Sequence, residues 1–162
     1  MTNREKTKRW ILLPRLRASG LLLLLGLVLG ACGGQHKVFR DYELSYSRSG
    51  GESPFYENVF VKGETLYYFY QKGKERYRRK ATVSAEEKRA LYEAVERNRL
   101  AGVREDHKKF YNHLTTSIKV RMADRTVFRD NGSGIRVEDA ARWENVVAAF
   151  EGLIESKNIR KP

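Results

Sequence analysis

The fold is decided by residues 56–83, which read YENVFVKGETLYYFYQKGKERYRRKATV. Turns at 62–64 and 72–73, each with a glycine, divide this stretch into three extended segments. Aromatic and β-branched side chains, which suit a half-buried pleated surface, fill the first two, and the third is very basic. Short segments that are joined by glycine turns are typical of β-hairpins. We therefore expect antiparallel strands at 56–61 and 65–71, and a basic strand that ends near Val83.

The pattern extends from this stretch in both directions. Upstream, alternation of residue types from Val38 to Tyr46 predicts a first strand, followed by a loop over 47–54. Downstream, a capping box at 84–87 predicts a helix that stops near Gly102. Polar residues 103–113 have no regular pattern, and strands are expected at 116–122 and 126–130. A final helix over 138–156 is indicated by apolar residues at three- and four-residue spacing.

The element order is therefore ββββ-α-ββ-α. Because consecutive strands joined by short turns pair antiparallel, this order predicts an α+β fold. We expect an antiparallel sheet of about six strands with two helices packed on one face, formed by a single domain over residues 37–160.

Composition excludes several protein classes. The 162 residues include 32 Lys+Arg against 20 Asp+Glu, which gives a net charge of +12, and one cysteine. A length of this size suits one domain. A single cysteine excludes an intramolecular disulfide framework and a zinc finger built from cysteines.

The N-terminal segment has the layout of a secretory signal. Residues 1–17 carry six basic residues and one acidic residue, and a leucine-rich run follows over 21–29. A positive segment, a short apolar segment and small residues before a cleavage site are typical of signal peptides. The apolar run is about half the ~20 residues that a membrane-spanning helix needs.

The run ends in Leu29-Gly30-Ala31-Cys32. This resembles the lipobox of bacterial lipoproteins, in which a leucine and two small residues precede a cysteine. The resemblance implies a signal peptide over residues 1–31, cleavage before Cys32, a diacylglyceryl group on the Cys32 thiol, and a short tether over residues 32–36. Two alternatives remain: an uncleaved anchor helix with an incidental cysteine, and ordinary secretory cleavage that leaves Cys32 free.

The same resemblance gives a location. A lipoprotein is anchored by acyl chains in the cell membrane or outer membrane, with its domain facing the periplasm or the exterior. Gly33 stands where an aspartate commonly signals inner-membrane retention in enterobacterial lipoproteins, which favours the outer membrane. Apart from the covalent lipid on Cys32, we expect no cofactor.

The charge of the mature chain is concentrated in one segment. Without residues 1–31, the chain keeps 26 Lys+Arg and 19 Asp+Glu, a net charge of +7. Strand periodicity places Lys74, Arg76, Arg78 and Lys80 on one face, beside the aromatic run 67–70. This row is a candidate site for an anionic lipid or an envelope polymer. The alternative is an edge strand whose charges deter aggregation, and the frequency of Lys on edge strands favours it. We expect no nucleic-acid partner for an exported protein.

Catalytic and metal-binding patterns have little support. Asp106, His107 and His113 form a carboxylate and imidazole cluster, but their spacing matches no metal-ligand signature. The glycine-rich turn at 131–134 lacks the rest of a phosphate-binding loop. The chain contains neither a G-x-S-x-G elbow nor an H-E-x-x-H motif. We therefore predict no enzyme and no metal site.

A second resemblance concerns the domain itself. Ser47-Arg48-Ser49-Gly50-Gly51 after a first strand, with a late hairpin and helix, is similar to emfourin-type inhibitors of thermolysin-like proteases. It implies an inhibitor displayed at the envelope, and no inhibitory residue is assigned from it.

The leading hypothesis is a membrane-anchored lipoprotein that acts as a non-catalytic binding or envelope-associated module. Its candidate partners are a membrane and another protein. The alternatives are the protease inhibitor and a small hydrolase or metal-binding protein.

Overall fold

The computed structural model describes residues 42–52, 54–108, 110, 112–122 and 124–160. The expected signal peptide, Cys32 and the tether of residues 32–36 lie outside these residues. So do the first positions of the first expected strand, from Val38 to position 41.

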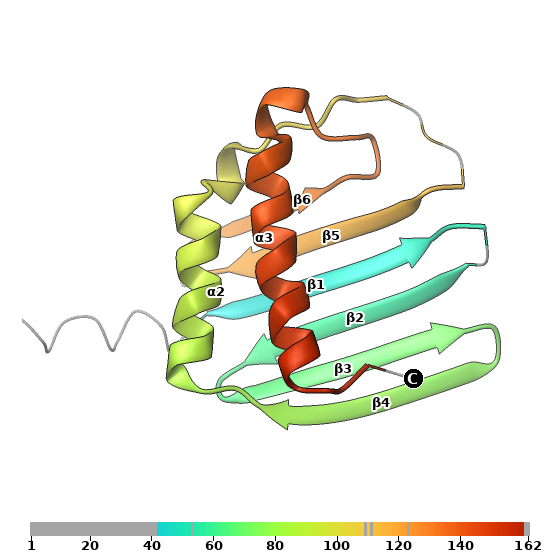
Figure 1. The fold of residues 1–162 in the computed structure, drawn as a ribbon, viewed down its shortest axis with the longest axis vertical. Helices are drawn as coiled ribbons and strands as arrows, with labels where there is room; N and C mark the ends of the chain where they lie inside the picture. Colours follow the sequence, from blue (N-terminus) through green and yellow to red (C-terminus); the bar gives the residue numbers. More distant parts are fainter. Residues whose placement is uncertain (1–41, 53, 109, 111, 123, 161–162) are drawn as a thin grey trace, which may run out of the picture. The chain divides into compact units, whose positions relative to one another are not determined.

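The described residues form one antiparallel sheet with two helices on the same face (Figure 1), which confirms the predicted α+β fold. The sheet has six strands in the order β4-β3-β2-β1-β5-β6, and every neighbouring pair is antiparallel. The strand bounds are β1 Glu43–Gly50, β2 Phe55–Lys62, β3 Thr65–Lys72, β4 Glu75–Thr82, β5 Leu114–Arg121 and β6 Thr126–Asp130.

Two glycines fix the register of strands β2 to β4. Gly63 and Gly73 have positive φ values of 59° and 57°, and each is the first residue of a two-residue hairpin loop. A glycine with positive φ at this position is typical of turns whose twist matches that of the flanking strands. The turns pair Lys62 with Thr65 and Lys72 with Glu75. Register in turn decides which side chains share a face.

Helix α2, Ala85–Arg97, begins at the predicted capping box. The Glu87 amide donates to Ser84 Oγ at 3.2 Å, and the Ser84 amide donates to Glu87 Oε2 at 2.8 Å. The expected stop near Gly102 is wrong, because Asn98 caps the helix and Arg99 adopts a left-handed conformation with φ 48°. A short 3₁₀ helix, η1 Leu100–Gly102, follows.

Helix α3, Val137–Ser156, lies beside α2 over the sheet (Figure 1). No helix in the described ranges is long and apolar enough to cross a membrane.

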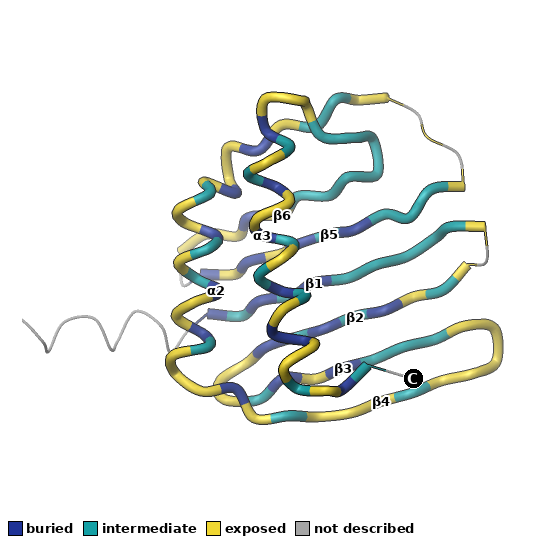
Figure 2. Tube along the Cα trace, in the orientation of Figure 1, coloured by how far each residue is buried: buried dark blue, intermediate teal, exposed yellow. Residues whose placement is uncertain are grey.

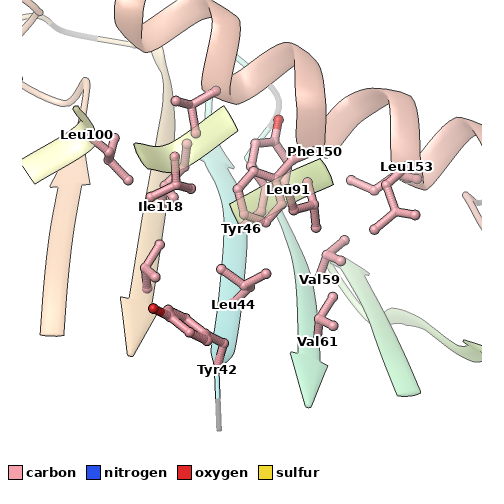
Figure 3. Packing of buried hydrophobic residues seen from close by; sticks show 14 of the residues in the cluster. Tyr42, Leu44, Tyr46, Val59, Val61, Leu91, Leu100, Ile118, Phe150 and Leu153 are labelled. Carbon is pink, nitrogen blue, oxygen red and sulfur yellow. The ribbon is translucent and has the colours of Figure 1, made fainter. Parts of the chain in front are cut away.

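The core lies between the sheet and the two helices. Buried and more exposed residues alternate along β1, β2 and β3 (Figure 2), as expected for strands with one covered face. Figure 3 shows Tyr46 of β1 against Phe150 of α3, where the ring centroids are 5.5 Å apart. The largest side chains that are almost fully buried are Tyr46, Tyr68, Phe150, Leu44, Leu66, Leu100, Ile118 and Ile154.

Strand β1 extends beyond its expected end at Tyr46 and includes part of the predicted loop over 47–54. It continues to Gly50, which pairs with Phe55 of β2 and with Leu114 of β5. Gly50 has φ 96°, and a Cβ there would lie 2.8 Å from the backbone oxygen of His113. Pairing on both sides therefore holds a serine-rich segment in the sheet, and only glycine fits at its end.

Candidate functional site

The side of the sheet that the helices leave uncovered carries a coherent set of side chains. In β2 and β3, Val59, Leu66 and Tyr68 are buried on the helix side, so the residues that alternate with them face the other way. The cross-strand register extends this assignment to β4. We call this surface the open face, and on β2 to β4 it consists of Tyr56, Asn58, Phe60, Lys62, Thr65, Tyr67, Phe69, Gln71, Arg76, Arg78, Lys80 and Thr82.

Three of the four predicted cations lie together on the open face. Arg76, Arg78 and Lys80 alternate along β4 and are exposed. Arg79, between them, points to the helix side, where its guanidinium donates to the Asn158 backbone oxygen at 3.5 Å. Lys74 is the exception, because it lies in the turn before β4 and not on the strand. The hairpin needs two residues to reverse the chain, and Lys74 is the second of them.

Two cations of β4 lie over aromatic rings of β3. The Arg78 guanidinium carbon is 5.3 Å from the centroid of the Phe69 ring. The Lys80 Nζ is 5.1 Å from the centroid of the Tyr67 ring. Both pairs follow from the register, which places Arg78 opposite Phe69 and Lys80 opposite Tyr67. Contacts of this kind keep a cation over a ring face while its outer side stays open to solvent.

A second row of rings, on β2, completes the surface. Tyr56 lies 5.9 Å from Phe69, and Phe60 lies 6.2 Å from Tyr67, between ring centroids. Tyr56 and Tyr67 are 43% and 39% exposed, although large hydrophobic side chains normally lie in the core. Four rings and three cations thus form one continuous patch over three neighbouring strands.

The charged side chains of the open face on β2 to β4 are all cationic. None of its positions on β2 to β4 is a carboxylate. Within the described residues, no ion pair joins Arg76, Arg78 or Lys80 to an acidic side chain. At the far end, Lys62 binds Glu43 at 2.8 Å, and this hydrogen bond lowers the pKa of the Glu43 carboxyl. The remaining cations are available to a ligand.

The patch is hollowed at its centre. A shallow hollow of about 450 Å³ is lined by open-face side chains of all three strands, together with the intervening Tyr68 and Arg79. Its open-face lining residues are Asn58, Tyr67, Phe69, Arg78 and Lys80. The arrangement offers apolar ring edges and two cationic heads to a bound group, which suits the binding of an anion that is partly apolar.

The carboxylate and imidazole cluster is not assembled as a site. Lys108 Nζ pairs with the Asp106 carboxylate. His113 Nε2 lies 3.1 Å from the Asn131 backbone oxygen. His107 is exposed and adopts a positive φ of 56°. In the part of the chain that the structure describes, no three His, Cys, Asp or Glu side chains come together as metal ligands.

The glycine-rich turn at 131–134 uses its polar groups internally. Asn131 Oδ1 accepts a hydrogen bond from the Thr116 amide at 2.7 Å. Asp130 Oδ1 accepts one from the Gly132 amide at 2.8 Å. These bonds fasten the turn to β5 and β6, as expected for a connection between a hairpin and a helix.

A buried charged cluster was not anticipated. Glu57 is on the helix side of β2 and only 3% exposed. It accepts hydrogen bonds from Arg160 Nε at 2.9 Å and from Tyr68 Oη at 3.1 Å. Arg160 also pairs with Glu151 of α3, at 2.5 Å. The alternation of Glu57 with Val59 and Val61 was the available sequence signal, since it places a carboxylate at a core position.

Two pKa values in this cluster are shifted. Burial raises the pKa of the Tyr46 hydroxyl well above its usual range, and its hydrogen bond to Glu151 adds to that effect. Burial alone would lower the pKa of Arg160, but the hydrogen bonds to Glu57 and Glu151 outweigh it and raise the pKa. Both groups therefore keep one protonation state at neutral pH, which suits a structural clamp on the C-terminal segment.

Asp139 forms a smaller buried ion cluster at the start of α3. It is 1% exposed, and its Oδ2 accepts hydrogen bonds from the Arg104 amide at 2.9 Å and from Arg104 Nε at 2.8 Å. Arg142 donates to its other oxygen. The hydrogen bonds from Arg104, followed by the one from Arg142, hold the pKa of this carboxyl far below its usual range. The cluster ties the loop after η1 to α3.

The residues of the inhibitor resemblance lie at the end of β1, where the Gly51 amide donates to the His113 backbone oxygen at 3.2 Å. Comparison with protein-family models and with curated proteins finds no match to this chain.

Proposed function

We propose that this protein is a lipid-anchored, non-catalytic binding module of the bacterial cell envelope, and that it binds an anionic ligand through the open face. The observation that carries the binding role is the row formed by Arg76, Arg78 and Lys80, which have no acidic partner among the described residues. Two of these cations, Arg78 and Lys80, lie over aromatic rings. Such a row beside exposed rings gains energy from a ligand that is both anionic and partly apolar.

The anchoring role rests on the sequence. The basic segment, the short leucine-rich run and Leu29-Gly30-Ala31-Cys32 occur in the order that a lipoprotein signal requires. A diacylglyceryl group, often with a further acyl chain, exceeds what stable membrane attachment needs. Cys32 is the single cysteine of the chain, so its thiol has no disulfide partner within the molecule.

Replacement of Cys32 tests the anchor. In Cys32→Ala cells, we expect the precursor to accumulate uncleaved, and in the wild type we expect the mass of the mature chain to include a diacylglyceryl group. Gly34→Ala is the matched control, because it changes a small residue nearby and leaves the four lipobox residues intact. If Cys32→Ala is processed and retained on membranes like the wild type, the lipoprotein proposal is wrong.

A further inference from the structure

We propose that the ligand of the open face is the anionic surface of a phospholipid membrane, so that the domain lies on the bilayer with this face against the headgroups. The proposal rests on the proposed function in one respect, because lipid attachment at Cys32 keeps the domain beside a membrane.

The charge of the open face complements such a surface. Arg76, Arg78 and Lys80 are spaced two residues apart along β4, which is about 7 Å per step. They form an extended row and not a pocket for one compact anion. Each Lys or Arg that approaches an anionic bilayer strengthens binding by about fivefold. No carboxylate on β2 to β4 of this face opposes the attraction.

The rings suit the interfacial layer of a membrane. Tyrosine has an apolar ring and a polar hydroxyl, and it is enriched at membrane–water interfaces. Tyr56 and Tyr67 are exposed in the same patch as the cations, and they contact Phe69 and Phe60 respectively. Because Arg78 and Lys80 lie over rings, their apolar stems can enter the same layer while the charged heads bind phosphates.

Because the lipid anchor keeps the domain beside the bilayer, even a weak contact of the open face suffices for docking. Cys32 is eleven positions before Glu43, the first residue of β1, and a fully extended chain of that length spans at most about 40 Å. A connection of this length between Cys32 and β1 holds the open face at a high local concentration relative to the bilayer. A few cations therefore suffice to dock the domain, and loss of two of them should release it.

A tryptophan reporter tests the docking. The full-length protein carrying Tyr67→Trp is reconstituted into vesicles that contain brominated lipid, which quenches tryptophan at short range. One set of vesicles is phosphatidylcholine, and the other includes about 30 mol % phosphatidylglycerol as the anionic lipid. Trp143 is buried, and protein without the reporter gives the background from the natural tryptophans.

We expect quenching of the reporter in anionic vesicles only, and less of it as salt is added, because salt screens surface charge. Arg76→Gln with Arg78→Gln should lower the ratio of docked to undocked domain by about 25-fold, the product of two fivefold steps. The matched control is Arg99→Gln with Arg136→Gln. It removes the same charge from two exposed positions outside the open face, and it should keep the quenching.

Three results overturn the proposal: equal quenching in neutral and anionic vesicles, quenching that survives the Arg76/Arg78 double change, and no quenching in either vesicle type. If the reporter is quenched in neither vesicle type and the protein instead binds an acidic peptide or an oligonucleotide, the open face binds a soluble partner. Failure of the anchor is distinguishable, because it appears as a missing lipid on Cys32, whereas the contrast between the two vesicle types reports the open face alone.

Discussion

Replacement of Arg160 by methionine tests whether the buried charged cluster clamps the C-terminal segment to the sheet. Arg160 Nε binds Glu57 at 2.9 Å, and its Nη2 binds Glu151 at 2.5 Å. The Glu57 side chain is only 4% exposed. Methionine keeps the apolar stem and removes the guanidinium, so the change isolates the loss of charge and hydrogen bonds.

The expected loss of stability depends on how far each partner is buried. Removing one partner of a buried ion pair costs about 3–5 kcal/mol, whereas an exposed pair contributes about 0–1 kcal/mol. The Arg160 side chain is 32% exposed, and Arg48 remains 3.5 Å from both carboxylates. The cost should therefore lie between these limits, and we expect Arg160→Met to lower the free energy of unfolding by about 2 kcal/mol.

A double-mutant cycle in urea unfolding measures the interaction. Glu57→Gln removes the buried charge, so Arg160→Met should cost at least about 1 kcal/mol less in that background than in the wild type. Arg136→Met is the control, because it removes an exposed cation without an ion pair among the described residues and should change stability by less than about 0.5 kcal/mol. If Arg160→Met is also within that range, or if the two changes are additive, the cluster is not a clamp.

Two further predictions concern side chains on the helix side of the sheet. The Tyr77 hydroxyl is buried without a hydrogen-bond partner in the described part of the chain. Tyr77→Phe should therefore raise the free energy of unfolding, measured by urea titration, by about 1 kcal/mol. Tyr68→Phe breaks the 3.1 Å hydrogen bond to Glu57 and should lower the free energy of unfolding. For Asp139, the pKa is lowered in the folded state, so its stabilising contribution is complete above the unfolded value of about 4 and is lost as pH falls below it. The stability difference between wild type and Asp139→Asn should therefore be largest at neutral pH and shrink in acid; a constant difference down to low pH would contradict the assignment.

The sheet was largely predictable because local signals specify it. Gly63 and Gly73 set two tight turns, and alternating residue types identify the strands between them. The end of β1 was not predictable from its own residues, since serines and glycines over 47–51 are typical of loops. They lie in the sheet because β2 and β5 pair with β1 on both sides, which is a property of distant segments.

The candidate site was also predictable only where local signals specify it. Alternation along one strand placed Arg76, Arg78 and Lys80 on one face, but it began the strand one residue too early and so included Lys74. Which rings lie against these cations depends on the cross-strand register. The partner of Glu57 lies 103 positions away, and no pattern within β2 could identify Arg160.

Protection of the edge strand and binding of a ligand predict different side chains on the open face. Cations on an exposed edge deter pairing with another chain, and β4 is an edge strand. That role does not require exposed rings on β2 and β3, two strands that are already paired on both sides. The opposite edge strand, β6, carries no cation on the open face at its alternate positions from Thr126 to Asp130. Protection of the edge thus accounts for charge on β4 alone, whereas binding of an anionic, partly apolar surface accounts for the cations and the rings together.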